Sequence, residues 1–594
     1  MGDSFHMVEQ IRSYMKEDHI DAWIIYGSDP HASEYPPKRY LTREYVSQFS
    51  GSAGTIVITH EEALLWTDSR YFIQAAKELK ETPFKLMKQG ETSVEDFPTY
   101  VARVLPPHSR VGFEGSCTTE LSYNALKSVL YAKNIEVVAT KDYFDHIWKD
   151  RPSLPISETV ELADEVAGLS SKKKIEQVRQ LLLTKGATST IISSLDDIAW
   201  LLNLRGSDVS YNRVFVAYLI VTTKSVLLFT DEKRFSAEIR NRLTHFVELY
   251  PYEEFFTTIT TLFSPSDVLY YSAERTSVRT LSSLSPKLKL IEGRDISTDL
   301  KAVKNNTELK GMREAHIADG IAMVRLLAHL ETTDHLYTEL SLEKKLEEFR
   351  QKGEHYIGPS FRTIAGFGEH GALAHYSSTD ESDVPLQGDT LLVLDSGGHY
   401  QTGTTDITRT LLFGKPTKQM KKDYTLVLKG HIALATQKFP SGTTGYQLDA
   451  LARQFMWNNH IQYGHGTGHG IGFCLNVHEG PQSISPRALS VPLQKGMIVS
   501  DEPGIYREGE YGIRLENLIV VQHDLDTNFG EFLSFEVITL CPFERRLIDL
   551  SLLQEEEIAV VDAYHQWVYS TLESHLDEQE RLFLEQATRK LKLP

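Results

Sequence analysis

Four carboxylates within one stretch constrain this chain more than any other feature. The stretch begins at Asp395 and ends at Glu516, with Asp406 and Glu502 between them. Each of the four adjoins a short apolar or β-branched run, which is the pattern of a buried strand. Carboxylates are costly to bury unless cations or hydrogen-bond donors compensate their charge. The stretch therefore predicts a cation site that is built from β-sheet.

The first two carboxylates are predicted to face each other in a β-hairpin. Residues 391–394 form a buried strand that ends at Asp395, and a turn is expected at residues 396–398. The return strand, residues 404–411, carries Asp406. A hairpin brings opposite side chains to within about 5 Å of each other. Two buried carboxylates at this distance repel, so both ionise only when cations lie between them.

The second pair of carboxylates repeats this arrangement. Residues 497–500 form a strand that leads into a predicted turn at residues 501–504, which contains Glu502. The return strand, residues 512–521, carries Glu516. Two hairpins are thus expected to supply four acidic ligands to one site.

A glycine-spaced histidine segment lies between the two hairpins and contains His465, His469 and His478. The glycines on either side of His469 allow close backbone packing, and we expect its imidazole to join the carboxylates as a ligand. The glycine spacing does not match the dinucleotide-binding fingerprint, so a phosphate-binding loop is disfavoured. Four carboxylates and one histidine are too many ligands for one zinc ion, and they suit a pair of divalent ions.

The ligand chemistry favours Mn²⁺ for both ions, because oxygen-rich ligation suits manganese better than zinc. Co²⁺, Fe²⁺ and Zn²⁺ stay open as alternatives. Each residue taken alone has a plainer interpretation, since a single aspartate at a strand end usually caps a turn. The ordered set of five ligands in one domain is what indicates a metal centre.

The residues before this stretch indicate one α/β domain that occurs twice. In both copies a hairpin of two strands is followed by a Thr-Asp pair, which ends at Asp68 in the first copy and at Asp231 in the second. This separation is far longer than a solenoid period of roughly 20–50 residues, so it indicates a duplicated domain. A polar linker with two prolines, residues 149–155, separates the copies.

The predicted fold class is therefore α/β and α+β multidomain, with two related N-terminal α/β domains. Residues 304–308 are expected to cap a helix, and this helix begins the third domain, which contains the metal ligands. The expected parts are residues 1–150 and 151–303 for the two α/β domains, 304–541 for the metal-binding domain, and 542–594 for a helical extension.

Composition and charge exclude several classes of function. The formal net charge is −19, which disfavours nucleic acid as a partner because phosphate binding needs clustered Lys and Arg. No membrane partner is expected, since the sequence contains no apolar run of membrane-spanning length. Three cysteines cannot form a disulfide framework in 594 residues, which fits a reducing compartment. The first residues lack the apolar core of a signal peptide, so we expect a cytoplasmic protein.

The motifs of the third domain resemble those of the pita-bread metallopeptidases. They are DSGGHYQTGTTDITRT, GHGTGHGIG followed by LNVHEGP, SDEPGIY and GIRLEN. FSGSAGT and LLWTDSRYF in the first domain, IAWLLNLRGSDV in the second and DAYHQW in the tail also look like the large, three-domain form of Xaa-Pro aminopeptidase (aminopeptidase P). The resemblance covers nearly the whole chain and implies two creatinase-like α/β domains before a pita-bread catalytic domain.

The resemblance also implies a role for each metal ligand. Asp395 would bind one ion, and His469 and Glu502 would bind the other. Asp406 and Glu516 would bridge both ions. Glu502 is in addition expected to carry a proton to the leaving nitrogen.

Further residues match positions around the metals in this family. The residues that are expected to act in catalysis or to bind substrate are His375, His465, His478, Tyr506 and Arg514. Donor groups of His375 and His478 would stabilise the oxyanion of the reacting carbonyl. One departure from the family pattern is His370, which precedes Gly371 where the pattern has Asn.

The expected activity is hydrolysis of the bond between the first residue of a peptide and a following proline, by a hydroxide that the two metals share. An Xaa-Pro dipeptidase (prolidase) is the alternative, and the second α/β domain with its polar loop at residues 200–213 disfavours it. We expect this loop to reach substrate. A metal-free binding scaffold is disfavoured because all five ligand positions carry competent residues. Members of this form are often dimers, which implies a homodimer.

Overall fold

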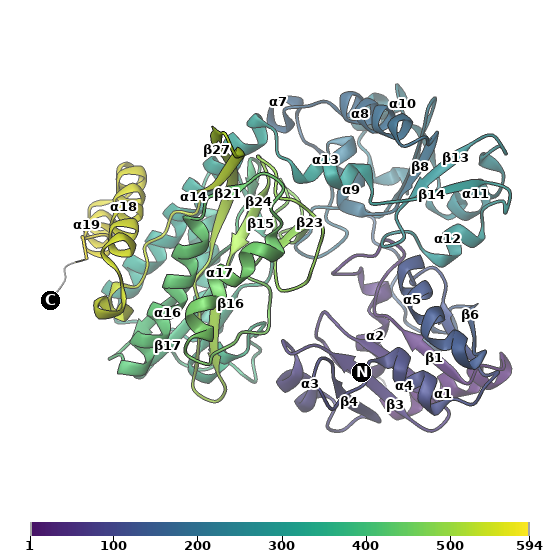
Figure 1. Ribbon diagram of the computed structural model, residues 1–594, viewed down its shortest axis with the longest axis horizontal. Helices are drawn as coiled ribbons and strands as arrows, with labels where there is room; N and C mark the ends of the chain where they lie inside the picture. The colour runs from purple at the N-terminus through teal and green to yellow at the C-terminus, as the bar shows by residue number, and fades with distance from the viewer. Residues whose placement is uncertain (1–2, 592–594) are drawn as a thin grey trace. The chain divides into compact units, whose positions relative to one another are not determined.

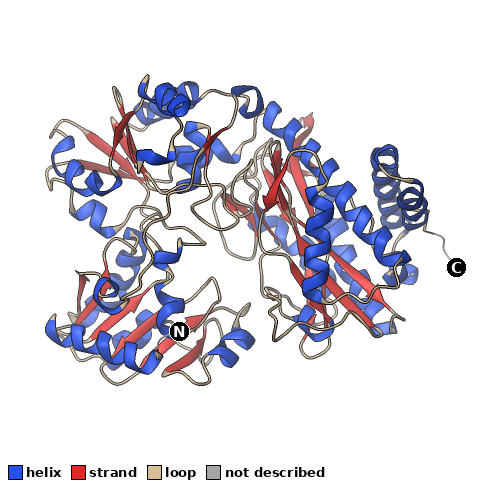
Figure 2. Ribbon diagram, turned by 180° about the vertical axis from the view of Figure 1, so that it is seen from behind, coloured by secondary structure: helices blue, strands red, loops and turns tan. Residues whose placement is uncertain are grey.

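The computed structural model of the chain describes residues 3–591. The chain divides into two compact units, which Figure 1 follows by colour along the sequence. The first unit comprises Met1–Asp164 and Leu169–Asp299, and the second comprises Glu165–Gly168 and Leu300–Pro594. Figure 2 shows that both units mix helices and strands. None of the helices among the described residues has the length and apolar character that a membrane span requires.

Two six-stranded sheets with the same topology make up the first unit. Their strand orders are β4-β3-β2-β1-β5-β6 and β12-β11-β10-β8-β13-β14. The strands of the first sheet are β1 Ala22–Ile25, β2 Thr55–Thr59, β3 Ala63–Thr67, β4 Phe84–Lys88, β5 Arg110–Glu114 and β6 Glu136–Thr140. The strands of the second are β8 Ser189–Ile192, β10 Tyr218–Thr222, β11 Val226–Phe229, β12 Glu248–Tyr250, β13 Val268–Tyr271 and β14 Lys289–Glu292.

Matching strands of the two sheets also run in the same directions. Strand β1 is antiparallel to β2 and parallel to β5, and β8 is antiparallel to β10 and parallel to β13. The outer strands β4 and β12 are likewise both parallel to their neighbours. The shared order and direction confirm the prediction of a duplicated α/β domain, and each sheet contains both parallel and antiparallel pairs.

Apolar side chains of β1 point alternately to the two faces of the first sheet, which explains why helices cover both faces. Trp23 and Ile25 pack in one core cluster with Ile11 of helix α1, Ser4–Glu17. Ala22 and Ile24 pack in another, with residues of α4, Phe97–Val104, and α5, Glu120–Leu130. Successive side chains of a strand point to opposite faces, so an entirely apolar strand needs a layer of helices on each side.

The apolar run at residues 215–221 is only partly a strand. Strand β10 begins at Tyr218, and residues 215–217 are buried without belonging to the ladder. The polar loop before this strand makes contacts inside the first unit. Arg205 donates to the carbonyl of Ala199 at 3.0 Å, and Asp208 pairs with Arg234 at 2.9 Å. Buried charges of this kind stabilise the conformation of the loop.

Two long hairpins, each covered by its own pair of helices, form the second unit. The first hairpin is β17 Thr390–Ser396 with β20 Ile407–Phe413, and the second is β24 Ile498–Asp501 with β27 Asn517–Thr527. Apolar residues of α14, Asn306–Thr332, and α15, Glu339–Gln351, pack on the first hairpin. Those of α16, Lys418–Ala435, and α17, Gly445–Trp457, pack on the second. Figure 1 shows α16 and α17 side by side along the strands.

The remaining strands of the second unit extend these hairpins. They are β15 Tyr356–Pro359, β16 Ile364–Phe367, β18 Gly398–Tyr400, β19 Gly403–Thr404, β21 Phe439–Pro440, β22 Gly468–Gly470, β23 Glu479–Ile484, β25 Gly504–Arg507, β26 Tyr511–Arg514 and β28 Gly530–Val537. The described part of the tail is helical, as predicted, with α18 Glu555–Leu572 and α19 Glu578–Ala587. Its His565 is fully buried and accepts a hydrogen bond from the Phe543 N–H at 3.1 Å, which makes it a structural residue.

Candidate metal centre

The first hairpin carries its carboxylates beside a break in its ladder. The inner ladder β17–β20 continues into a short outer ladder, β18–β19. The pairs on either side of the break are Ser396 with Ile407 and His399 with Thr404. The register is the same on both sides, so Asp406 lies in the break, opposite Gly397. The predicted turn at residues 396–398 is wrong, because Gly398 begins a strand and the chain does not reverse there.

The second hairpin has the same construction. Asp501 pairs with Asn517 in the inner ladder, and Gly504 pairs with Arg514 in the outer ladder of β25 and β26. The unchanged register puts Glu502 opposite Glu516 in the break. The predicted turn at residues 501–504 is therefore wrong as well. Pro503 lacks an N–H and interrupts the ladder, but the chain continues to residues 508–510 before it reverses.

Hydrogen bonds join the two hairpins edge to edge. The Glu516 N–H donates to the Thr408 carbonyl at 3.1 Å, and the Thr408 hydroxyl donates to the Glu516 carboxylate at 2.8 Å. The Arg514 N–H donates to the Thr410 hydroxyl at 3.0 Å. These contacts bring both breaks, and the carboxylates beside them, to one place.

His469 reaches these carboxylates from strand β22, which pairs with β23 and β24. Its Nε2 lies 3.4 Å from a carboxylate oxygen of Asp406 and 3.4 Å from one of Glu502. A Cβ on the preceding Gly468 would lie 1.9 Å from the Ser500 carbonyl, so only glycine fits there. Asp406, His469 and Glu516 offer ligand atoms that all lie within 4.8 Å of one another. Below, the candidate metal centre means Asp395, Asp406, His469, Glu502 and Glu516.

Burial and mutual repulsion shift the pKa values of Asp395, Glu502 and Glu516 upward. Burial raises the pKa of Asp395, which Arg514 opposes and Asp406 reinforces. Burial raises the pKa of Glu502 to about 7 despite the opposing charges of His469 and Arg514. Burial together with the charge of Asp406 raises the pKa of Glu516 well above its usual range. In the absence of cations, these carboxylates therefore retain protons that ordinary carboxylates lose.

The pKa of His469 moves in the opposite sense to that of most buried histidines. Burial by itself would lower it, but the carboxylates of Asp406 and Glu502 outweigh burial and raise it to about 9. One carboxylate oxygen of the site, Asp395 Oδ1, is buried without a hydrogen-bond partner. Four carboxylates and an imidazole in one buried place fit divalent cations, which would compensate the negative charge that Arg514 alone does not balance.

A line of hydrogen bonds connects further residues that the family resemblance singles out. His465 Nε2 lies 2.7 Å from the Tyr506 hydroxyl, and Arg514 Nη1 donates to the same hydroxyl at 2.7 Å. Arg514 Nη2 then donates to Asp395 Oδ2 at 2.5 Å. Tyr506 and Arg514 come from the outer ladder of the second hairpin. This ladder therefore connects the histidine segment with Asp395 on the first hairpin.

The other two histidines lie in different surroundings. His478 packs edge-on against His469, with 4.3 Å between the ring centroids. His375 is half-buried in the segment that follows the short 3₁₀ helix η5, Gly368–Ala372. Helix η5 packs closely on strand β26, because a Cβ on Gly512 would lie 1.7 Å from the Gly371 carbonyl.

Two hydroxyl residues of this region were missing from the sequence prediction. Thr408 donates to Glu516 and accepts from Arg514 Nε at 3.2 Å. Ser500 donates to Glu502 at 3.0 Å and accepts from the His469 N–H at 2.9 Å. Thr408 lies two residues after Asp406, and Ser500 lies two residues before Glu502. Both hydroxyl residues are on strands. Because side chains alternate between faces, this spacing of two was the signal that could have revealed them.

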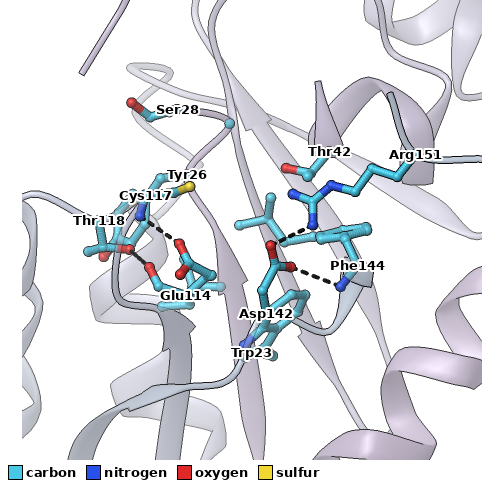
Figure 3. A pocket seen from close by; sticks show the side chains of 13 residues that line it. Trp23, Tyr26, Ser28, Thr42, Glu114, Cys117, Thr118, Asp142, Phe144 and Arg151 are labelled. Atoms are coloured by element: carbon cyan, nitrogen blue, oxygen red, sulfur yellow. Dashed lines mark hydrogen bonds and ion pairs between the residues drawn. The ribbon is translucent and has the colours of Figure 1, made fainter. Parts of the chain in front are cut away.

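A second group of acidic residues lines a pocket in the first unit, which the sequence prediction also missed. The sheet-end pocket lies at the carboxyl ends of the parallel strands β1, β5 and β6, and Figure 3 shows Glu114 and Asp142 among its lining residues. Glu114 accepts from the N–H groups of Ser116 at 3.0 Å and Cys117 at 2.6 Å. The cavity measures about 20 Å³, close to the space that one buried water molecule needs.

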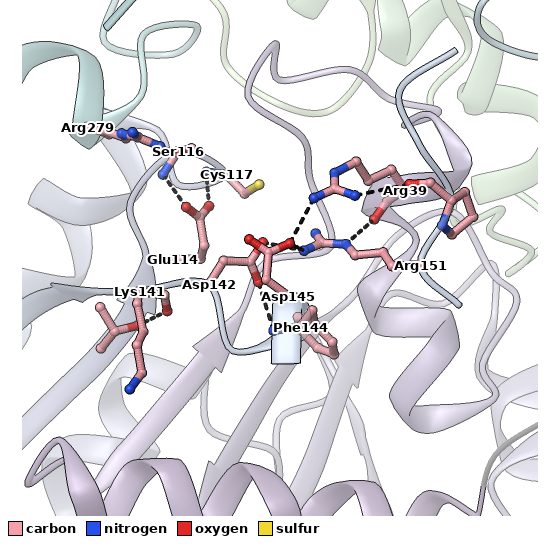
Figure 4. Close-up of polar contacts among 12 residues, drawn as sticks. Arg39, Glu114, Ser116, Cys117, Lys141, Asp142, Phe144, Asp145, Arg151 and Arg279 are labelled. Atoms are coloured by element: carbon pink, nitrogen blue, oxygen red, sulfur yellow. Dashed lines mark hydrogen bonds and ion pairs between the residues drawn. The ribbon is translucent and has the colours of Figure 1, made fainter. Parts of the chain in front are cut away.

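Arg151 compensates the second carboxylate of this pocket. It pairs with Asp142 at 2.6 Å and with Asp145 at 2.8 Å, and Figure 4 shows Arg39 completing the network. Burial raises the pKa of Glu114, and the hydrogen bonds from Cys117 and Ser116 oppose this rise. The sheet-end pocket thus has internal donors for both of its carboxylates.

Four matches to family descriptions cover most of the chain. Metallopeptidase family M24 matches residues 310–523, and the C-terminal region of peptidase M24 matches residues 531–591. The creatinase/prolidase N-terminal domain matches twice, at residues 7–147 and 150–308. The double match agrees with the two sheets of identical topology.

Individual relatives resemble the chain over nearly its full length. The chain is 40% identical to probable Xaa-Pro aminopeptidase P of Laccaria bicolor, with 94% of this chain and 88% of that protein covered. It is 38% identical to Xaa-Pro aminopeptidase 1 of Dictyostelium discoideum, with 94% and 91% covered. The crystal structure of X-prolyl aminopeptidase from Caenorhabditis elegans, described as a cytosolic enzyme with a di-nuclear active site, matches with a TM-score of 0.95, 33% identity and 100% coverage of both chains.

Proposed function

The chain belongs to metallopeptidase family M24, and we propose that it is a metal-dependent aminopeptidase for peptides with proline in second position. Its fold is that of the family, with two related α/β domains before a pita-bread domain and a helical tail. The observation that carries the proposal is that Asp406, His469 and Glu516 offer ligand atoms within 4.8 Å of one another, with Glu502 3.4 Å from His469 and Asp395 on the neighbouring strand β17. Full-length relatives that are named Xaa-Pro aminopeptidase support the choice of substrate.

Two divalent cations are the proposed cofactor. Asp395 would hold one ion, His469 and Glu502 the other, and Asp406 and Glu516 would contact both. We propose Mn²⁺, because carboxylate oxygens make up most of the ligand set. When bound, such a pair of cations lowers the pKa of a water molecule so that a hydroxide is available near neutral pH. The di-nuclear site of the C. elegans relative supports the number of ions.

Glu502 is proposed to move the proton that the reaction requires. The leaving nitrogen of a proline comes from a tertiary amide without an N–H, so cleavage requires a proton to be delivered to it. As a carboxylate next to the proposed nucleophile, Glu502 could take the proton from the attacking water and pass it to that nitrogen. Ser500 donates to its carboxylate at 3.0 Å and so orients the group.

The histidines and the outer ladder are proposed to hold the peptide. His375 and His478 would donate to the carbonyl oxygen as negative charge develops there. Tyr506 lies beside Arg514 and His465, where its ring offers an apolar surface to the proline of the substrate. These roles would position the peptide so that cleavage follows its first residue.

The organisation of the whole chain is proposed on the same basis. We propose α/β domains at residues 1–150 and 151–303, a catalytic domain at 304–541 and a helical extension at 542–594. The three free cysteines suit a reducing compartment, and the cytosolic location of the C. elegans relative supports the cytosol. A homodimer is the proposed assembly.

A comparison of two peptide lengths tests the proposed activity. Metal-free protein is supplied with Mn²⁺ and incubated with an Xaa-Pro-Pro tripeptide and, separately, with an Xaa-Pro dipeptide. The proposal predicts release of the first residue from the tripeptide. Cleavage of the dipeptide alone would identify an Xaa-Pro dipeptidase instead. Lack of cleavage with Mn²⁺, Co²⁺, Fe²⁺ and Zn²⁺ would show that the protein is not a metallopeptidase.

A further inference from the structure

A buried carboxylate outside the candidate metal centre collects three donors from one short region. Glu339 is the first residue of helix α15, and its side chain is fully buried. It accepts hydrogen bonds from the Phe367 N–H at 2.8 Å, from His370 Nδ1 at 2.9 Å and from the Tyr376 hydroxyl at 2.8 Å. Because a carboxylate only accepts, Nδ1 of His370 must carry a hydrogen in this arrangement.

The segment at residues 370–376 is consequently tied to Glu339 at both ends. The rings of His370 and Tyr376 stack on each other, with centroids 4.5 Å apart and 23° between their planes. His375 lies in the sequence between His370 and Tyr376, the two residues whose side chains bind Glu339. A short segment that is fixed at both ends has few conformations left, so its side chains keep defined positions.

Contacts on the other side direct this segment toward the candidate metal centre. Gly371 packs against Gly512 of strand β26, which carries Arg514. Farther along, the Arg362 side chain donates to the Ser378 carbonyl. Arg362 stands just before Ile364, the residue that pairs with Asp395 across β16 and β17. Ser378, two residues beyond the segment, is thus joined to the loop that leads into β16 beside Asp395.

We propose that Glu339 and His370 are positioning residues for His375. They hold the segment between helix α15 and strand β26, so that the His375 imidazole meets the substrate carbonyl in one orientation. The inference rests on the proposed function, because His375 acts on the substrate only if the chain is a peptidase. A displacement of about 1 Å at a reacting group can lower a rate by roughly a hundredfold.

The same contacts account for the departure at His370 from the family pattern. An asparagine side chain also offers one N–H to Glu339, so the two residue types can make the same hydrogen bond. His370→Asn is therefore the conservative substitution, and His370→Ala is the one that removes the anchor. A purely stabilising role for Glu339 is the competing explanation, since an acidic residue in the first turn of a helix is favourable in itself.

A double-mutant cycle separates positioning from stability. The full chain loaded with Mn²⁺ is assayed on an Xaa-Pro-Pro tripeptide as His370→Ala, His375→Ala and the double variant. We expect kcat to fall about 10²–10³-fold in His375→Ala, which loses an oxyanion donor. We expect a loss of about 10–100-fold in His370→Ala, with KM within about twofold of its original value. The double variant should be no slower than His375→Ala, because His370 acts through His375.

Two further variants complete this experiment. His370→Asn should keep kcat within about threefold of the unsubstituted protein, because the donor to Glu339 is retained. His329→Ala is the matched control, since it removes another half-buried histidine whose Nε2 lies 2.7 Å from the Tyr337 hydroxyl. This control should lower the melting temperature and leave kcat unchanged. The proposal would be overturned if the two decreases in kcat multiplied in the double variant. It would also be overturned if His329→Ala lowered kcat as much as His370→Ala does.

Hydrogen exchange tests the anchor without any assay of activity. In the full chain, His370→Ala should accelerate amide exchange across residues 368–376 and leave strand β17 unchanged. His370→Asn should leave both regions unchanged. Unaltered exchange in His370→Ala would refute the anchor even if the protein is an active peptidase. If the unsubstituted protein cleaves no peptide, the proposed function fails, whereas the exchange result still decides whether Glu339 and His370 fix the segment.

Discussion

The sheet-end pocket and the candidate metal centre both gather carboxylates at the ends of buried strands, but their compensation differs. In the pocket, Glu114 accepts two backbone N–H groups and Asp142 pairs with Arg151. In the candidate metal centre, Arg514 pairs with Asp395, Ser500 donates to Glu502 and Thr408 donates to Glu516, but Asp395 Oδ1 is buried without a hydrogen-bond partner. A cluster in which every acid has its own donors is structural, whereas several close acids with a histidine beside them and an oxygen left without a donor suit cations.

Glu339 strengthens this distinction. Its side chain is fully buried, and three donors from the chain satisfy it. A carboxylate in such surroundings needs no cation, and its structural effect is to fix the segments that supply the donors. The following predictions test whether the two kinds of acidic cluster behave as differently as their hydrogen bonds indicate.

Asp406→Asn should have the largest effect. The amide is a poor metal ligand, and Asp406 is proposed to contact both ions. Since Lewis acid catalysis is worth several kcal/mol, we expect activity to fall by a factor on the order of 10³ or more. Metal content by elemental analysis should fall together with peptide hydrolysis. Full activity with two ions retained would contradict the proposed bridging role.

His478→Ala should have the next largest effect, because the imidazole packs against His469 without being a proposed ligand. We expect kcat to fall about 10²–10³-fold, the usual loss for one oxyanion donor. Metal content is the control and should stay the same. If the substitution instead released metal and left the turnover of fully loaded protein intact, His478 would be a support for the ligands.

Stabilisation by Mn²⁺ should depend on pH in a defined direction. In the metal-free fold the pKa is raised to about 7 for Glu502 and to about 9 for His469. Ordinary values near 4.3 and 6.5 apply to the unfolded chain. The metal-free fold therefore binds more protons than the unfolded chain between about pH 4 and 9, and its stability falls as pH rises through this window.

Metal binding requires the deprotonated ligands, so Mn²⁺ offsets this loss most at the higher pH. The increase in melting temperature on adding Mn²⁺ should be greater at pH 8 than at pH 6, by roughly 2–4 °C. Asp406→Asn serves as the control and should show little increase at either pH. A greater increase at pH 6 would contradict the sign of both pKa shifts.

Glu114→Gln should have the smallest effect on function. The substitution weakens the acceptor for two backbone N–H groups, so we expect the free energy of unfolding to fall by about 1–2 kcal/mol. Activity and metal content should not change, because the pocket satisfies its own charges. Loss of bound metal in this variant would remove the distinction between the two acidic clusters.

The sequence allowed prediction of the strands beside the proposed ligands better than prediction of the turns between those strands. Apolar runs marked the strands beside Asp395 and Glu516, because a strand that is buried on both faces has few polar residues. The turns at residues 396–398 and 501–504 were predicted wrongly. Glycine and Pro503 usually mark turns, but here they mark interruptions of ladders that continue beyond them.

Other features could not be predicted because they depend on contacts between residues far apart in the chain. Glu339 meets His370 across 31 residues, and no local pattern indicates the pair. The sheet-end pocket likewise combines Glu114 with Asp142 and Arg151 only after three parallel strands have assembled. Local patterns record burial and periodicity, whereas the partners of a buried charge are determined by tertiary structure.

Anomalous diffraction from crystals grown with Mn²⁺ tests the central claim most directly. Two peaks are predicted, roughly 3.5–4 Å apart, with Asp406 and Glu516 in contact with both. The sheet-end pocket beside Glu114 and Asp142 should contain no peak. A single peak at the hairpins, or a peak of equal height in the pocket, would contradict the account that the acids at the two ladder breaks bind a pair of ions and those of the pocket bind none.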